Sequence, residues 1–118
     1  MLTRWIYHLS RKVDWDADKR GGRYEGPKED RADGFLHFSA ASWVVERARR
    51  HRIRETALLL LEVDAYTLIP NLKSKTFRGG DLFPLLYGSL HAAVAASEFE
   101  LSLGPNGLHL FTPIKAFR

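Results

Sequence analysis

One stretch of ten residues, DGFLHFSAAS at positions 33–42, gathers the side chains best suited to chemistry. Residues 35–38 are apolar or aromatic around one histidine, which is typical of a short buried strand. Side chains alternate between the two faces of a strand, so His37 and Ser39 share one face. The pattern therefore predicts an imidazole and a hydroxyl side by side, and both are candidate catalytic groups.

A helix is expected to follow this strand, with Ser39 or Ser42 as its capping residue. Apolar residues recur at helical spacing within it, and its charged residues, Arg47 among them, are assigned to solvent. The first N–H groups of a helix have no partner inside it, so they suit a phosphate or carboxylate. Beside them, His37 could donate a hydrogen bond to a ligand or act as a general acid or base.

A structural interpretation of the same residues stays open. A buried histidine bonded to a backbone carbonyl, and a serine that only caps a helix, would give the same sequence pattern. His8, on the first predicted strand, is a further polar candidate for a cleft.

Length and composition limit the classes of protein. The 118 residues, 45% of them hydrophobic and 27% charged, predict one globular domain spanning residues 1–118. Cysteine is absent, which excludes disulfides, thiol nucleophiles and zinc-cysteine sites. The five histidines do not fall at metal-ligand spacing, so no metal site is predicted.

No segment resembles a signal peptide, and the longest apolar run is too short to span a membrane, so a soluble cytoplasmic protein is expected. The net charge of +4 makes polyanions plausible partners. Five basic residues lie in one segment: Arg47, Arg49, Arg50, Arg52 and Arg54. An alternative function is therefore a non-catalytic module that binds RNA or an acidic partner, in a manner that weakens steeply as salt rises.

The remaining elements are predicted from pattern. Strands are expected at residues 5–9, 56–63 and, as a lysine-bearing edge, 73–78, with a helix at 13–20 capped by Ser10 or Asp14 and anchored by Trp15. Residues 22–33 are expected to form a surface loop, 64–72 an irregular connection with one helical turn, and 83–87 an apolar plug. Residues 92–111 are expected to form two strands joined by a GPNG turn.

Several short motifs in the sequence resemble those of a known family of small bacterial proteins, domain-of-unknown-function family 952. They are IYHL near the start, DGFLHFS, LLLLEV, RGG, FP followed by LYG, and GPNG, and they span nearly the whole chain. The family is grouped with the ADP-ribosyltransferase-like fold. The resemblance thus implies an α+β fold in which small split β-sheets and two or three short helices surround a cleft that binds NAD in active members.

The resemblance also implies site residues. His8 and Ser39 would take the places of the first-strand histidine and second-strand serine of such enzymes. Further ligand-binding residues would be Asp33, Ser42, Arg78 and Tyr87, with Arg78 pairing with phosphate.

Two departures from the family pattern affect the expected chemistry. Lys75 stands near the position of a glutamate, and a cation there would repel a developing oxocarbenium charge. Leu85 stands where a histidine is usual. The expectation is therefore binding of NAD, ADP-ribose or a related phosphate-bearing nucleotide near His37, with ADP-ribosyl transfer as the reaction if there is one.

Overall fold

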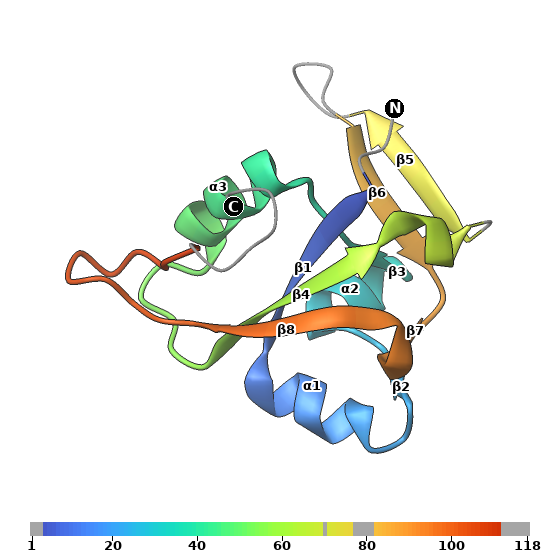
Figure 1. Cartoon of the computed structure of the whole chain (residues 1–118), viewed down its shortest axis with the longest axis horizontal. Helices are drawn as coiled ribbons and strands as arrows, with labels where there is room; N and C mark the ends of the chain where they lie inside the picture. The colour runs from blue at the N-terminus through green and yellow to red at the C-terminus, as the bar shows by residue number, and fades with distance from the viewer. Residues whose placement is uncertain (1–3, 70, 77–81, 112–118) are drawn as a thin grey trace.

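The computed structural model describes residues 4–69, 71–76 and 82–111, which form an α+β domain of small antiparallel sheets and three α-helices (Figure 1). The strands pair in three sheets: β1 (Trp5–Arg11), β4 (Leu58–Asp64) and β8 (Ala95–Leu101); β3 (Phe35–His37), β6 (Leu82–Tyr87) and β5 (Leu72–Thr76); and β2 (Arg23–Tyr24) with β7 (Leu90–His91). The helices are α1 (Lys12–Lys19), α2 (Lys28–Asp33) and α3 (Ala41–His51), with short 3₁₀ turns η1 (Ala65–Leu68) and η2 (Ala92–Val94). None of the helices within these described residues is long and apolar enough to cross a membrane.

The sheet β1-β4-β8 is the central layer and is covered on both faces. On one face, Tyr7 of β1 packs in a cluster with Val44 and Ala48 of α3. On the other face, Ile6 of β1 packs in a cluster that includes Trp15 and the residues of the two smaller sheets. Figure 1 shows α3 on one side of this sheet and β5 and β6 on the other. The continuous apolar run of β4 follows from its place inside, since residues 58–63 are all buried.

The two three-stranded sheets meet where β3 ends. Beyond His37 the chain crosses the free edge of β1, and Ser39 and Tyr7 exchange two backbone hydrogen bonds of 2.8 Å. β1 is an edge strand in its own sheet, so this bridge satisfies backbone groups that would otherwise be unpaired. It also fixes His37 and Ser39 beside β1.

Several predictions from the sequence are confirmed. The first strand, the helix with Trp15 buried, the interior strand at β4 and the single helical turn after it are all present. Leu72–Thr76 forms the expected edge strand, next to β6 only, and the last two residues predicted for it lie outside the described residues.

Other predictions are wrong. The segment 22–33 is not a loop, because it contains β2 and α2. The predicted plug at 83–87 is β6, the middle strand of its sheet. After β8 the expected second strand is reduced to an isolated bridge between Leu103 and His109.

The predicted serine caps are also wrong. α3 begins at Ala41 with Ala40 as its N-cap and without a side-chain capping bond, because the backbone of Ser39 is already paired with Tyr7. α1 likewise has Arg11 at its N-cap and no side-chain cap, so neither Ser10 nor Asp14 serves.

Gly26 lets the chain turn tightly before α2. Its φ is +91°, and a Cβ placed there would clash with the Leu36 side chain and lie 3.2 Å from Cβ of Asp30. Gly26→Ala is therefore expected to lower the free energy of unfolding by about 3 kcal/mol in urea denaturation, from backbone strain and overpacking together.

Gly22→Ala is the matched control. Gly22 also has a positive φ, +79°, but no atom lies within 4 Å of an added Cβ, so the loss should be only about 1 kcal/mol. Equal losses in the two variants would contradict the close packing described for Gly26.

Candidate functional site

A cavity of about 400 Å³ opens at the free edge of β1. Four elements border it: β1, the end of β3, the start of α2, and the face of α3 that turns toward the sheet. Its lining residues are Tyr7, His8, Leu9, Pro27, Glu29, Asp30, His37, Ser39, Val44, Arg47, His51 and Arg52. Three of the residues predicted from the sequence, His8, His37 and Ser39, thus border one cavity.

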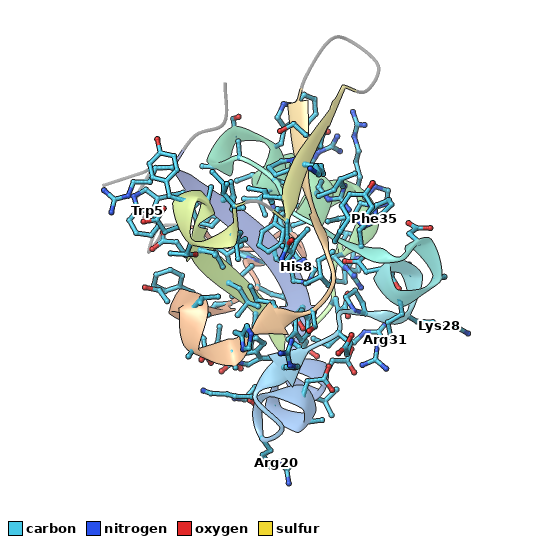
Figure 2. The ribbon with its side chains drawn as sticks, turned by 90° about the vertical axis from the view of Figure 1, so that its right-hand side faces the viewer. Trp5, His8, Arg20, Lys28, Arg31 and Phe35 are labelled. Carbon is cyan, nitrogen blue, oxygen red and sulfur yellow. The ribbon has the colours of Figure 1, made fainter. Side chains whose placement is uncertain are left out.

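His8 is held by hydrogen bonds at both ring nitrogens. Nδ1 lies 2.7 Å from the carbonyl oxygen of His37, which can only accept, so Nδ1 is the donor. In the neutral ring Nε2 then accepts from the Tyr24 hydroxyl, 2.8 Å away. The ring is only 3% exposed, and Figure 2 places His8 in the middle of the molecule.

Burial determines the charge state of this pair. It lowers the pKa of His8, against the opposing charge of Asp30, and it raises the pKa of Tyr24. His8 is thus neutral and Tyr24 protonated, which agrees with an Nε2 atom that accepts from the Tyr24 hydroxyl. Both ring nitrogens of His8 are therefore engaged within the fold, whereas His8 was predicted to be a polar group for a ligand.

His37 is oriented by a buried carboxylate. Its Nδ1 donates to Oδ1 of Asp30 at 2.7 Å, and its backbone N–H donates to Oδ2 at 3.0 Å. Burial alone would raise the pKa of Asp30, but the hydrogen bonds from His37 and the neighbouring histidines together hold that pKa below its usual value. Nε2 of His37 has a looser neighbour, the Asp33 carboxylate at 3.5 Å, and the side chain is 21% exposed. His37 can therefore exchange protons with a ligand through Nε2.

Ser39 lines the cavity although the residue is only 2% exposed. Its backbone is paired with Tyr7, but its hydroxyl makes no hydrogen bond with any of the residues that the structure describes. A hydroxyl in this position can donate to or accept from a ligand in the cavity.

Arg47 enters the cavity from α3, whereas the sequence pattern assigned it to solvent. The side chain is largely buried, and this burial lowers its pKa. Arg49 and Arg50 bond to Glu46, and Arg52 bonds to Glu29. Arg47 has no such ion pair within the described part of the chain, although the charges of Asp30 and Glu29 act on it from the same cavity lining.

The other predicted residues lie elsewhere. Ser42 is exposed on α3 and does not line the cavity, and the 45%-exposed ring of Tyr87 packs against Phe35 outside it. Asp33 is exposed and reaches the site only through its contact with His37. Arg78 lies outside the described residues.

Sequence reasoning missed Asp30 and His51 as functional candidates, and it considered Arg47 only as part of a surface that binds RNA or an acidic partner. Val44, Arg47 and His51 follow one another at helical spacing on one face of α3, a signal that was hidden by counting arginines as solvent-facing. Asp30 was concealed in a charged segment. Among the residues described here, no three His, Asp or Glu side chains gather closely enough to hold a metal ion.

The neutral state of buried His8 makes stability depend on pH. Because its folded-state pKa is below the usual 6.5, the unfolded chain binds more protons and unfolding becomes easier as pH falls below about 6.5. Chemical denaturation between pH 7.5 and 5 should show the unfolding free energy falling by up to about 1.4 kcal/mol per pH unit from this group. Asp30, whose pKa is also lowered, adds a further loss only below about pH 4.

His8→Gln should be less stable at pH 7.5 and should have a flatter dependence on pH in this range. His91, which is exposed on β7, provides the control, since His91→Gln should keep the wild-type slope. A wild-type slope in His8→Gln would contradict the assignment of the effect to His8.

Comparison with known proteins identifies relatives with this fold. Residues 9–97 match the family described as Protein of unknown function (DUF952). The crystal structure of protein CC0527 from Caulobacter crescentus is 38% identical, with a TM-score of 0.86 over 90% of this chain and 93% of that chain. The solution structure of CC0527 is 37% identical, with a TM-score of 0.82 over 92% and 94% of the two chains. No curated protein matches the chain.

The resemblance seen in the sequence is thus confirmed at the level of the family, since the family match covers most of the chain and CC0527 has the same fold. The chain belongs to the DUF952 family, whose function is unknown.

Proposed function

We propose that the chain binds a phosphate-bearing nucleotide, of the class of NAD, ADP-ribose or a related nucleotide, in the cavity beside His37. The observation that carries the proposal is Arg47, a largely buried guanidinium that lines the cavity without a carboxylate ion pair among the described residues. A buried cation costs free energy unless it is paired, and a phosphate oxygen is the partner that fits a guanidinium best.

The neighbours of Arg47 suit the same ligand. The free hydroxyl of Ser39 and Nε2 of His37 can both hydrogen-bond to phosphate or ribose oxygens. Glu29, which also lines the cavity, is already bonded to Arg52 at 2.9 Å, so its charge is partly compensated. Arg47 would thus have a phosphate-binding role like the one predicted for Arg78, which lies outside the described residues.

The size of the cavity limits how much ligand it encloses. A volume of about 400 Å³ lies in the lower part of the range for small-molecule sites. One nucleotide unit fits this space, and the rest of NAD or ADP-ribose would extend outside it. Small sheets bordering a cleft also agree with an ADP-ribosyltransferase-like fold, which we include in the proposal by family analogy alone.

Catalysis by ADP-ribosyl transfer has less support. Leu85, which stands where a family histidine is usual, is buried and pairs with His37 across β3 and β6. It offers no polar group to a ligand.

The alternative, binding of RNA or an acidic partner through the arginine segment, requires these arginines to be available together. Arg49 and Arg50 are tied to Glu46, and Arg52 to Glu29 and Glu55, while Arg47 turns into the cavity. The arrangement favours a pocket-bound anion over an extended polyanion.

Arg47→Gln is expected to weaken binding of ADP-ribose by about 10- to 100-fold in isothermal titration calorimetry, since a charge-assisted hydrogen bond contributes about 1.5–3 kcal/mol. NAD, ADP and inorganic phosphate should be titrated in parallel to find which part of the ligand is needed.

Arg49→Gln is the control on the same helix. It removes an exposed arginine that bonds to Glu46 and should leave ADP-ribose affinity unchanged. If Arg49→Gln abolished binding of a short RNA, with steep salt dependence, and Arg47→Gln did not affect any nucleotide, the alternative would replace our proposal.

A further inference from the structure

The cavity brings together two histidines of different kinds and one arginine. His37 comes from β3 with its Nδ1 bonded to the buried carboxylate of Asp30, and His51 comes from the last turn of α3. Arg47 lies one helical turn before His51, so both side chains project from the same face of α3 into the lining of the cavity. Binding a nucleotide needs the arginine but does not need a carboxylate-oriented imidazole.

Resting on the proposed function, we infer that the site hydrolyses a nucleoside 2′,3′-cyclic phosphate without a metal ion, with His37 as general base, His51 as general acid and Asp30 as the positioning residue. The inference comes from the arrangement of three side chains around one cavity. His37 would then act in hydrolysis of the cyclic phosphate and not in ADP-ribosyl transfer.

The role of Asp30 follows from the hydrogen bonds. Because its carboxylate accepts from Nδ1 of His37 at 2.7 Å and from the His37 backbone at 3.0 Å, it fixes both the tautomer and the orientation of the ring. With Nδ1 as the donor, the neutral form of the ring carries its lone pair on Nε2, whose neighbour is the exposed Asp33 carboxylate at 3.5 Å. A base held in this way needs no reorganisation before it accepts a proton.

Nε2 of His37 removes a proton from water as the water oxygen forms a bond to phosphorus. The bond between phosphorus and one ring oxygen, O2′ or O3′, breaks, and protonated His51 gives its proton to that oxygen. Arg47 stabilises the charge on the non-bridging phosphate oxygens. The products are a nucleoside monophosphate and a free hydroxyl, and solvent returns the proton from His37 to His51.

Two properties favour a cyclic phosphate over other nucleotides as the substrate. A cyclic mononucleotide is a single nucleotide unit, which suits a cavity of about 400 Å³ better than a dinucleotide does. In addition, a strained five-membered phosphodiester is a nucleotide ester that acid and base groups can open by themselves.

The test uses the full chain with adenosine 2′,3′-cyclic phosphate in the presence of EDTA, and product formation is followed by phosphorus NMR. Wild type should release adenosine 2′- or 3′-phosphate. His37→Ala and His51→Ala should each lower kcat about 100-fold or more, the range for loss of one acid or base. His91→Ala, on exposed β7, should retain wild-type kcat.

The dependence of kcat on pH separates the two histidines. Wild type should give a bell-shaped profile, and His51→Ala should lose the fall on the alkaline side, because no acid then has to stay protonated. Asp30→Asn should lower kcat with little change in KM, as expected when a base is misoriented. The charged groups that face His37 are Asp30 and Asp33 of α2, with Arg47 of α3 lining the same cavity.

Binding is measured separately with adenosine 3′-phosphate, the product. If the product binds in a manner that depends on Arg47 but the cyclic phosphate is not hydrolysed, the inference is overturned and the proposed function stands. If no nucleotide binds, both fail. Hydrolysis that is unaffected in His51→Ala would also overturn the inference, and this variant should fold because His51 is exposed.

Discussion

The contact between the end of β3 and the free edge of β1 determines the arrangement of the rest of the site. Ser39 and Tyr7 exchange backbone hydrogen bonds of 2.8 Å, and His8 donates to the carbonyl oxygen of His37 at 2.7 Å. These bonds join the central sheet to the smaller sheet β3-β6-β5 at one point. Because the chain continues directly into α3, the same contact also sets where that helix packs, and the cavity lies between.

Two charged groups near this contact differ in how their charge is compensated. The carboxylate of Asp30 is buried but accepts hydrogen bonds from the ring and the backbone of His37, so its charge is compensated within the fold. The guanidinium of Arg47 is largely buried and lines the cavity without an ion pair in the described part of the chain. The first arrangement stabilises the fold, and the second is what we interpret as the place of an anionic ligand.

The sequence predicted the elements that have a clear hydrophobic pattern, such as the apolar strand β4 and the first helix with its buried Trp15. The sequence did not predict strands that form through pairing with distant segments. β2 has only two residues and exists because it pairs with β7. Pro84 lies inside β6, although proline opposes strand formation. His37 and Ser39 were recognisable from the alternation of faces. The inward position of Arg47 was not recognisable from the sequence, because it depends on how α3 packs against β1.

The proposed ligand, an anionic nucleotide, would occupy the cavity between β1, β3 and α3. A titration with ADP-ribose followed by two-dimensional ¹H–¹⁵N NMR tests it most directly. Binding in the cavity predicts saturable shifts concentrated on the amides of His37, Ser39 and Arg47 and on the last turn of α3, with little change in β8. Shifts confined to the outer face of α3 around Arg49 and Arg50, or none at all, would contradict it.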